Sequence, residues 1–351
     1  MDTINDMSMT LAPGLAAIDA KAVTAPMHAI VRRRYGTPDV LTLEQVERPI
    51  PGEDEVLVRV HAAGASIGDH HVVTGTPYVI RLSPHGGVLR PRRPVPGQAF
   101  AGRVEAIGAK ITTFRPGDDV YGDAPAGAFA EYAIVPAQRL APKPTNLSFE
   151  EAAATPWAIT PLQALRDVGA VQPGQKVLIN GASGGVGSWA IQLAKAFGAE
   201  VTAVCSARNA DMVRALGADA VIDYTKEDFV TGGARFDLVF DTVGNRALAD
   251  FRRVLNPTGT YVSCSGGNSS WRWLLQLAKV SLTSLFTRQK LKMFIVSPNR
   301  ADLMSLKELV EAGKARPAVE RHYALGEVAD ALRHVGAGHT RGQVVIRVLN
   351  E

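Results

Sequence analysis

A short glycine-rich stretch constrains this sequence more than any other feature. Residues 176–187 read Lys-Val-Leu-Ile-Asn-Gly-Ala-Ser-Gly-Gly-Val-Gly, so an apolar run typical of a buried strand leads directly into clustered glycines. The residues from Gly187 to Phe197 have the apolar spacing of a helix. Glycines let a backbone approach a pyrophosphate closely, and a helix N-terminus offers aligned N–H groups to an anion. The pattern, in which Ala182 replaces the usual first glycine, predicts a dinucleotide site at Ser183, Gly184, Gly185 and Val186.

Strand and helix patterns alternate on both sides of this stretch. Ser148 precedes two glutamates, which indicates a helix start. Strands are predicted at 176–180, 200–205, 220–222, 236–241 and 259–264, with helices at 187–197, 210–216 and 246–255. This alternation indicates an α/β region with a parallel sheet covered on both faces. A purely structural glycine turn is the alternative to a dinucleotide site, and the surrounding strands and helices favour the dinucleotide.

The end of the second predicted strand bears on which dinucleotide is bound. In NAD sites an acidic residue at this point accepts the ribose hydroxyls. Here the strand ends in Val-Cys-Ser-Ala-Arg at 204–208, so Ser206 and Arg208 take its place. A carboxylate would repel a 2′-phosphate, whereas serine and arginine bind one through hydrogen bonds and charge. The sequence predicts NADPH, the alternative being an exposed Arg208 and loose selectivity.

Composition excludes several other classes of protein. The 351 residues include two cysteines, too few for a disulfide scaffold or a cysteine-rich zinc lobe. No apolar run is long enough to span a membrane. The net charge of +4 includes arginine clusters at 32–34 and 90–93, which we interpret as solvated surface rather than a nucleic-acid site, since no aromatic residues are interleaved. Residues 1–26 lack a secretory pattern and predict a flexible tail on a cytoplasmic protein.

Before the chain returns to short elements, residues 271–290 have the pattern of an amphipathic helix. One stripe at helical spacing is apolar and comprises Leu274, Leu277, Ala278, Leu282, Leu285 and Phe286. A membrane-surface helix and a helix packed over the sheet or the active-site mouth both fit this pattern. We favour the packed helix, because such stripes are common in globular proteins. A strand at 292–296, a helix at 302–312 and a strand at 342–349 are predicted beyond it.

Upstream of residue 150 the chain consists of short strand patterns separated by Pro and Gly, typical of a β-rich unit. Motifs here and further along are Val-Arg-Val-His-Ala-Ala-Gly at 58–64, Gly-Arg-Val-Glu-Ala-Ile-Gly at 102–108, Arg-Pro-Gly-Asp-Asp-Val at 115–120, Leu-Gly-Ala-Asp at 216–219 and Arg-Gly-Gln-Val-Val at 341–345. Together with the glycine stretch they resemble the zinc-independent, quinone-oxidoreductase-like branch of the medium-chain dehydrogenase/reductase superfamily.

That resemblance implies a domain organisation. We expect a GroES-like, β-rich catalytic domain at 27–150 and a doubly wound Rossmann domain that binds NADP at 151–298. The chain is expected to return to the catalytic domain at 299–351, with the cofactor in the cleft between the domains. The family also implies a homodimer, and a strand at 292–296 could pair across a twofold axis.

The resemblance further implies that no metal is bound. Zinc-dependent members carry a cysteine at the position of Ser66, and Gly-His-Glu where this chain has Gly-Gln-Ala at 97–99. A catalytic zinc needs three protein ligands. His70 and His71 are adjacent and would face opposite sides of a strand, so they offer no substitute.

Site residues are carried over position by position from the same resemblance. Positions that hold the 2′-phosphate are matched by Ser206, Arg208 and Tyr224. Positions that line the path from adenosine to nicotinamide are matched by Thr160, Val243, Gly244, Ser265 and Gly266. The candidates for polar catalytic groups are Ser66, His71 and Tyr78.

These catalytic candidates have alternative roles. His71 matches a position that relays protons in zinc-dependent relatives, and a structural histidine is the alternative. Tyr78 follows Pro77 in a predicted loop, where it could donate a proton to an enolate or pack as an aromatic lid. Asp69 could be a base, although we expect it to orient the local backbone.

The absence of zinc ligands bears on the reaction. Negative charge that develops on the acceptor must then be stabilised by hydrogen bonds. A conjugated acceptor spreads this charge, whereas a plain ketone places it on one oxygen, a task that zinc usually eases. The sequence predicts NADPH-dependent hydride transfer to a small-molecule quinone or enone. One alternative is an aldehyde or ketone reductase resembling alcohol dehydrogenase; another, suggested by Ala99 where the branch often has Asp, is an NADPH-binding sensor or structural protein with little turnover.

Overall fold

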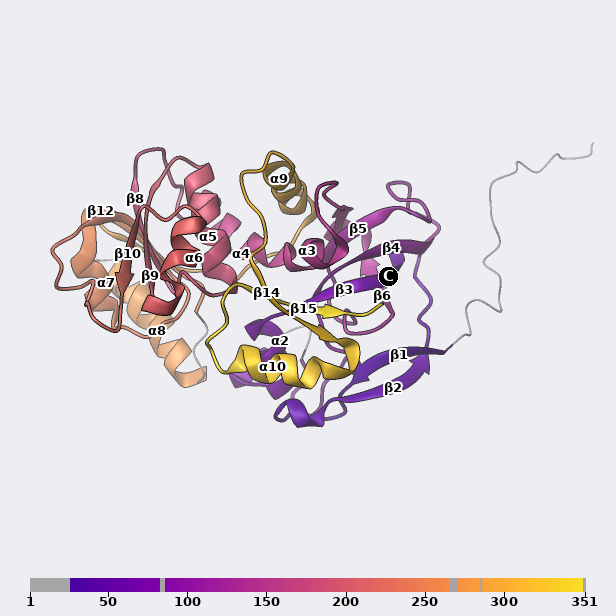
Figure 1. The fold of residues 1–351 in the computed structure, drawn as a ribbon. Helices are drawn as coiled ribbons and strands as arrows, with labels where there is room; N and C mark the ends of the chain where they lie inside the picture. The colour runs from indigo at the N-terminus through magenta and orange to yellow at the C-terminus, as the bar shows by residue number, and fades with distance from the viewer. Residues whose placement is uncertain (1–25, 83–85, 266–269, 285, 350–351) are drawn as a thin grey trace, which may run out of the picture.

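The computed structural model of the chain describes residues 26–82, 86–265, 270–284 and 286–349. Two sheets with their helices lie at opposite ends of the molecule, and helices α3, α4 and α9 lie between them (Figure 1). The predicted tail at 1–26 lies outside the described residues except for Pro26, which begins β1. Among the described residues, no helix has the length and apolar character needed to cross a bilayer.

The first lobe is built on a mixed sheet of seven strands. Its strand order is β14-β15-β3-β4-β5-β7, with β6 also paired to β3. The strands are β3 (Glu55–Ala65), β4 (Ala99–Ile107), β5 (Asp119–Asp123), β6 (Tyr132–Pro136), β7 (Leu140–Pro142), β14 (Val319–Ala324) and β15 (Gln343–Arg347). In β3, Val58 and Val60 are buried and Arg59 is exposed, as alternation in a half-buried strand requires.

Several elements of the first lobe were not predicted. The hairpin of β1 (Pro26–Val31) and β2 (Thr42–Glu47) lies at its edge, and helices α2 (Ile67–Thr74) and α10 (Val328–Gly336) pack against each other. Strand β15 pairs with β3, so the end of the chain joins the sheet formed by its beginning. These contacts join segments that are distant in sequence, which local patterns do not reveal.

The second lobe contains the predicted parallel sheet. All six strands are parallel, in the order β10-β9-β8-β11-β12-β13. They are β8 (Lys176–Asn180), β9 (Glu200–Cys205), β10 (Ala220–Asp223), β11 (Phe236–Asp241), β12 (Leu255–Ser263) and β13 (Lys290–Met293). From β8 the chain adds β9 and then β10 on one side. It then adds β11, β12 and β13 outward on the other side. This is the doubly wound arrangement, in which ligands bind where the strand order reverses.

Helices cover this sheet as the alternation predicts. They are α5 (Gly185–Ala196), α6 (Ala210–Ala215), α7 (Leu248–Val254) and α8 (Ser270–Ser284). Helix α5 begins two residues earlier than predicted and buries Trp189, Leu193 and Ala194 against the sheet. The predicted strands at 176–180, 200–205 and 236–241 are confirmed residue for residue.

Two predictions near residue 290 are wrong. The amphipathic helix ends at Ser284 instead of 290, and the next strand is Lys290–Met293 instead of 292–296. The reason is the buried Gln289, whose side chain donates hydrogen bonds to the carbonyl oxygens of Arg252 and Asn256 at 2.9 and 3.4 Å. This anchor places Leu291 opposite Tyr261 of β12, so the strand begins two residues earlier than the apolar pattern indicates.

The helix also packs differently from our expectation. It contacts β13, as a helix packed over the sheet would. Among its side chains whose burial the structure describes, Val280 is buried, whereas Ala278 and Leu282 of the predicted packing stripe are exposed. Phe286, counted in the same stripe, is exposed as well and follows the helix end.

The two lobes are joined by short helices and a polar network. Helix α3 (Phe149–Ala154) starts with a capping box between Ser148 and Glu151, α4 (Ile159–Gln163) contacts α5, and α9 (Arg300–Glu311) is capped by Asn299.

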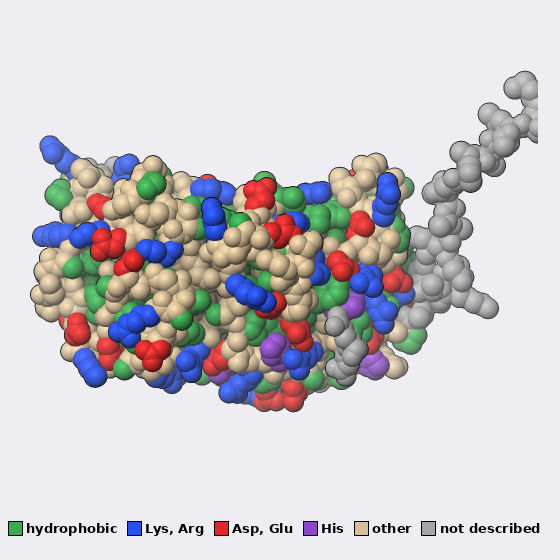
Figure 2. Space-filling view, turned by 45° about the horizontal axis from the view of Figure 1, so that its top comes forward, with side chains coloured by type: hydrophobic (Ala, Val, Ile, Leu, Met, Phe, Trp, Pro, Cys, Tyr) green, Lys and Arg blue, Asp and Glu red, His purple; other side chains and the backbone are tan. Residues whose placement is uncertain are grey.

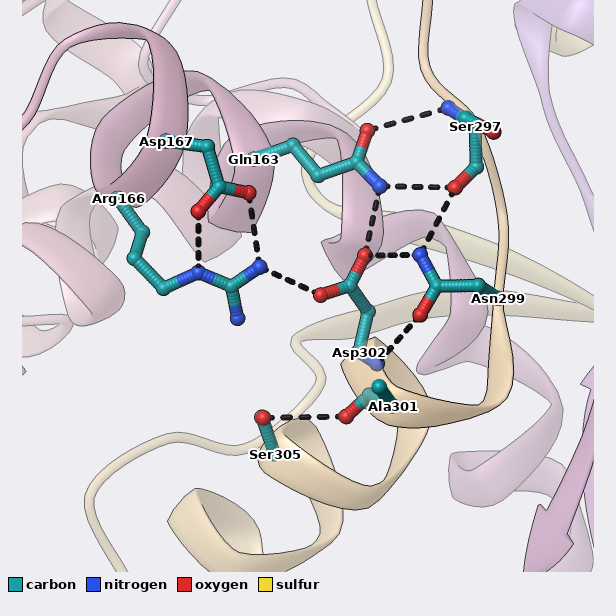
Figure 3. A network of polar contacts seen from close by, with 8 residues as sticks. All are labelled: Gln163, Arg166, Asp167, Ser297, Asn299, Ala301, Asp302 and Ser305. Atoms are coloured by element: carbon teal, nitrogen blue, oxygen red, sulfur yellow. Dashed lines mark hydrogen bonds and ion pairs between the residues drawn. The ribbon is translucent and has the colours of Figure 1, made fainter.

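In the network, Asp302 accepts hydrogen bonds from Gln163, Arg166 and Asn299 at 2.6, 2.6 and 2.7 Å (Figure 3). Burial opposes ionisation of Asp302, but these bonds prevail and lower its pKa. The network fixes the start of α9 against α4.

Charged side chains are mixed on the face shown in Figure 2, where Lys and Arg lie among Asp and Glu and not in a block of one sign. Arg33, Arg34 and the arginines at 90, 92 and 93 are exposed, as interpreted from the sequence. The interpretation is wrong for Arg32, which is buried and donates a hydrogen bond to the carbonyl oxygen of Val72.

Candidate active site

The glycine stretch between β8 and α5 is shaped by close backbone packing. Gly181 has a φ of +83°, and a Cβ there would lie 2.4 Å from Oγ1 of Thr242. A Cβ on Gly187 would lie 2.2 Å from the carbonyl oxygen of Gly181. At Gly184, in contrast, the nearest atom would be 3.6 Å away. Gly181 and Gly187 therefore let the loop pack on itself and on the residue that follows β11. Gly184 leaves space in front of the loop.

A buried carboxylate organises the neighbouring strand end. Asp241 closes β11, and its Oδ1 accepts hydrogen bonds from the N–H groups of Val243 and Gly244 at 3.1 and 3.0 Å. Nδ2 of Asn180 donates to the same oxygen at 2.9 Å, and the Tyr261 hydroxyl donates to Oδ2 at 2.9 Å. Sequence reasoning missed these positioning residues, although polar residues ending two adjacent apolar strands were a usable signal. The network turns Val243 outward, with 46% of its surface exposed.

The third strand end brings Ser265 to the same place. The Ser265 Oγ lies 2.9 Å from Oγ of Ser263, and a Cβ on Gly244 would lie 2.6 Å from the Ser265 Oγ. Ser265 and Gly244 are therefore in contact, as their predicted shared role requires. Thr160 is half-buried on α4, which packs against α5. Gly266 lies outside the described residues.

The residues predicted for the 2′-phosphate follow β9 and β10. These strands pair in register with Asp223 opposite Cys205, so Tyr224 and Ser206 lie side by side beyond the sheet. The N–H of Tyr224 donates to the carbonyl oxygen of Cys205 at 3.2 Å. Arg208 is exposed, and its Nη2 donates a long hydrogen bond of 3.4 Å to the carbonyl oxygen of His339. Ser206 and Tyr224 are thus neighbours at the ends of two paired strands, with the Asp223 carboxylate accepting a hydrogen bond from the N–H of Ala207 at 3.1 Å beside them.

The last strand of the first lobe touches the glycine loop directly. Nε2 of the buried Gln343 donates to the carbonyl oxygen of Gly185 at 2.7 Å. The N–H of Gly342 donates to the carbonyl oxygen of Ser183 at 2.9 Å. These bonds join the start of β15 to the first turn of α5, a link that local sequence patterns could not indicate.

The catalytic candidates come from the first lobe, at and after α2. Ser66 is the N-cap of α2, and its hydroxyl donates to Oδ2 of Asp69 at 2.9 Å while accepting from the Asp69 N–H at 3.3 Å. The Ser66 N–H donates to the same carboxylate oxygen at 3.0 Å. Asp69 therefore orients the local backbone, as expected.

Burial has a strong effect on this carboxyl group. It raises the pKa of Asp69 to about 7, against the hydrogen bonds from Ser66, and the nearby Asp123 acts in the same direction. Burial likewise raises the pKa of Asp123 to about 6, partly offset by Arg139, whose Nη1 lies 2.9 Å from its Oδ1. Asp69 and Asp123 are therefore two buried carboxyl groups that interact and whose pKa values burial raises.

The two histidines lie in a helix, which corrects the strand geometry assumed from sequence. Nδ1 of His70 lies 3.1 Å from the carbonyl oxygen of Leu332, and a Cβ on Gly336 would lie 2.4 Å from its ring. His70 thus serves the packing of α2 on α10. The His71 ring lies edge-on to it at 6.2 Å.

Tyr78 is also placed differently from the prediction. It starts a 3-10 helix, Tyr78–Leu82, instead of lying in a loop, because the ring stacks over the Arg81 guanidinium at 4.5 Å. Its side chain is 64% exposed.

Sequence reasoning missed Trp157, which contacts the cap of α2. A Cβ on Gly64 would lie 2.7 Å from its Nε1, and one on Gly68 would lie 3.9 Å from its ring. This Nε1 is buried and has no hydrogen-bond partner among the described residues.

A nicotinamide dinucleotide fits the second-lobe residues. Helix α5 begins at Gly185, and the N–H groups of a first helical turn have no partner within the helix. The open space at Gly184 lies before these donors, and Val243, Ser265 and Tyr224 continue along the ends of the strands. Across the part of the chain that the structure describes, no three His, Cys, Asp or Glu side chains gather into a metal site.

Comparisons with known proteins agree with both lobes. The family described as alcohol dehydrogenase GroES-like domain matches residues 52–145, and the family described as zinc-binding dehydrogenase matches residues 216–346.

Two curated relatives are similar over most of the chain. The 2-methylene-furan-3-one reductase of Solanum lycopersicum is 34% identical, over 93% of this chain and 80% of its own. The chloroplastic NADPH-dependent alkenal/one oxidoreductase of Arabidopsis thaliana is 33% identical, over 94% and 83%. Among solved structures, the quinone oxidoreductase from Coxiella burnetii has a TM-score of 0.81 at 31% identity, covering 93% of this chain and all of its own.

The chain belongs to the medium-chain dehydrogenase/reductase superfamily. Its place within the superfamily is the quinone-oxidoreductase-like branch, so it is an oxidoreductase that uses a nicotinamide cofactor. The predicted fold class, a GroES-like β-rich domain with a Rossmann domain, is confirmed.

Proposed function

We propose that this protein is a zinc-independent, NADPH-dependent reductase that transfers hydride to conjugated carbonyl compounds, quinones or enones. The observation that carries the proposal is the cap of α2. Ser66 stands where zinc-dependent members have a cysteine ligand, and its hydroxyl is bonded to Asp69 within the cap. Two similar proteins, an alkenal/one oxidoreductase and a quinone oxidoreductase, support the same acceptor class.

The cofactor assignment is part of the proposal. Ser206, Arg208 and Tyr224 offer hydroxyl groups and one cation, a combination that suits a 2′-phosphate. The pyrophosphate is assigned to Ser183, Gly184, Gly185 and Val186 at the start of α5. The rest of the path is assigned to Thr160, Val243, Gly244, Ser265 and Gly266.

The reaction that we propose follows from the groups around the start of α2. NADPH supplies a hydride from C4 of its nicotinamide ring. The hydride adds to the β-carbon of the acceptor, the C=C electron pair moves toward the carbonyl oxygen, and a proton completes the reduction. Because conjugation spreads the developing charge, hydrogen-bond donors suffice to stabilise it. His71 and the exposed Tyr78 hydroxyl are the candidate donors, and water can supply the last proton.

We also propose the domain limits predicted above, with the catalytic unit at 27–150 and 299–351 and the cofactor unit at 151–298. The placement of β14 and β15 in the first sheet supports this division. Homodimerisation and a cytoplasmic location stay predictions. For the dimer, β13 is available at the sheet edge. The Arabidopsis relative, in contrast, carries the word chloroplastic in its name.

A panel of acceptors tests the proposal. Purified protein is given NADPH or NADH with quinones, α,β-unsaturated ketones and simple aldehydes, and cofactor oxidation is followed. We expect turnover of quinones or enones with NADPH preferred, and no stoichiometric zinc by elemental analysis of the same preparation. Turnover of aldehydes alone would favour an alcohol-dehydrogenase-like reductase, and NADPH binding without any turnover would favour a sensor. Either result would contradict the proposal.

A further inference from the structure

Helix α8 of the second lobe presents an apolar face to the outside. Leu275, Ala278 and Leu282 are exposed, the last at 62% of its surface, and they share one side of the helix at spacings of three and four residues. Phe286, just beyond the helix end, is 82% exposed. On the opposite side, Val280 is buried and Leu277 is half-buried. The side of α8 that faces away from the sheet is therefore the side that exposes leucines.

The charge of this segment differs from that of the rest of the chain. Residues 270–298 contain Arg272, Lys279, Arg288, Lys290 and Lys292 and no acidic residue, although the whole chain has 34 Asp and Glu against 38 Lys and Arg. Lys279, Arg288 and Lys290 are exposed. The segment also contains Trp271, Trp273 and Phe286. Exposed leucines bordered by cations without acids are the combination that binds at the interface of an anionic bilayer.

We propose that the outer face of α8, formed by Leu275, Ala278, Lys279 and Leu282 and continued by Phe286 and Arg288, binds peripherally to an anionic lipid surface. The leucines and Phe286 would enter the headgroup boundary while Lys279 and Arg288 pair with lipid phosphates and carboxylates. A second copy of the chain is a poorer occupant. A twofold contact through this face would bring Lys279 and Arg288 against the same two cations of the second copy, with no acidic residue of the face to pair with them.

The position of α8 gives this binding a consequence for the enzyme. The helix begins five residues after Ser265, one of the residues assigned to the cofactor path. A bilayer on its outer face would hold the second lobe close to acceptors dissolved in the membrane. The lipid-binding step itself does not depend on the proposed reaction, so the two can fail separately.

Vesicle flotation of the full-length protein tests this inference. The probes are phosphatidylcholine vesicles with and without phosphatidylserine, at physiological ionic strength. We expect flotation with the phosphatidylserine vesicles and little without it, decreasing as salt is raised. Leu282→Ser should weaken the partition coefficient about tenfold, since it removes an exposed leucine side chain that would enter the bilayer. Lys279→Glu with Arg288→Glu should weaken it at least about thirtyfold, given roughly fivefold for each cation.

Ile50→Ser is the matched control, because Ile50 is 63% exposed and lies in the first lobe. It should float like the wild type, and all variants should keep the wild-type Tm and turnover with a water-soluble acceptor. Equal flotation of Leu282→Ser and Ile50→Ser would overturn the proposal. So would a wild type that ignores phosphatidylserine, or a Leu282→Ser variant that changes only the oligomeric state in sedimentation, which would assign the face to a second copy.

Discussion

The cofactor side and the acceptor side of the candidate active site are built in different ways. Around the loop between β8 and α5, glycines set the shape, since a Cβ on Gly181 or Gly187 would lie 2.4 or 2.2 Å from a neighbouring atom. At the start of α2, side chains set the shape, and Ser66 and Asp69 are bonded mainly to each other. A backbone site depends on local conformation and is visible in a short motif. A site formed by side chains depends on burial by segments that are distant in sequence, so a short motif reveals less of its geometry.

The largest effect expected from this contrast is at Gly187. In Gly187→Ala the new Cβ would lie 2.2 Å from the Gly181 carbonyl oxygen, so the loop must move away from α5. We expect a loss of stability of about 1–3 kcal/mol and cofactor binding too weak to detect by fluorescence titration. Gly232→Ala is the control, because no atom lies within 4 Å of a Cβ there. Unchanged binding in Gly187→Ala would show that the loop does not hold the pyrophosphate.

Arg208 is the side chain on the cofactor side that should determine the preference for NADPH over NADH. Because the 2′-phosphate exists only in NADPH, Arg208→Ala should weaken NADPH binding roughly 10–100-fold, the range of a charged hydrogen bond. NADH binding should change less than about twofold. Isothermal titration with each cofactor makes the measurement. Equal losses for the two cofactors would remove Arg208 from the phosphate site.

On the acceptor side, Asp69 can be tested through the pH dependence of the unfolding free energy. Burial raises its pKa to about 7 from an ordinary 3.8, so the folded protein holds this proton more tightly than the unfolded chain. Its contribution therefore lowers the unfolding free energy as pH rises from about 4 through 7. Asp69→Asn, which keeps an acceptor for the Ser66 N–H, should flatten this decline and gain about 4 kcal/mol over wild type by pH 8, relative to pH 4.

Urea unfolding at a series of pH values measures this difference. Asp123, whose pKa is also raised by burial, and the neighbouring cations Arg32 and Arg139 stay in both proteins, so the comparison isolates Asp69. Parallel pH profiles for the two proteins would mean that folding does not raise the pKa of Asp69.

A substitution at Gln343 should have the smallest effect on cofactor binding. It tests whether the contact between the first lobe and the glycine loop contributes to that binding. Gln343→Ala removes the 2.7 Å hydrogen bond to the Gly185 carbonyl oxygen, which should raise the Kd for NADPH about fivefold. Gln192→Ala is a matched control. Gln192 also bridges α5 to a returning segment, through Arg316, and does not bond to the glycine loop. The same change in both variants would indicate general loosening of the lobes.

The contrast also explains what the sequence could and could not predict. The strands β8, β9 and β11 were predicted residue for residue, because each is an apolar run ended by a polar residue or glycine. The cap of α2 was missed because Ser66 and Asp69 lie among residues with no clear apolar period. Gln343 was missed because its partner is far away in the chain. The exposed face of α8 was misjudged, since periodicity shows that a helix is amphipathic and does not show which face is covered.

The central claim is that hydride reaches the conjugated carbon of an acceptor rather than a carbonyl carbon. Reduction of an α,β-unsaturated ketone with NADPH carrying deuterium at C4 tests it most directly, with the product analysed by NMR. The account predicts deuterium on the β-carbon and an intact carbonyl group. Deuterium on the carbon of a newly formed alcohol would contradict it and identify a carbonyl reductase.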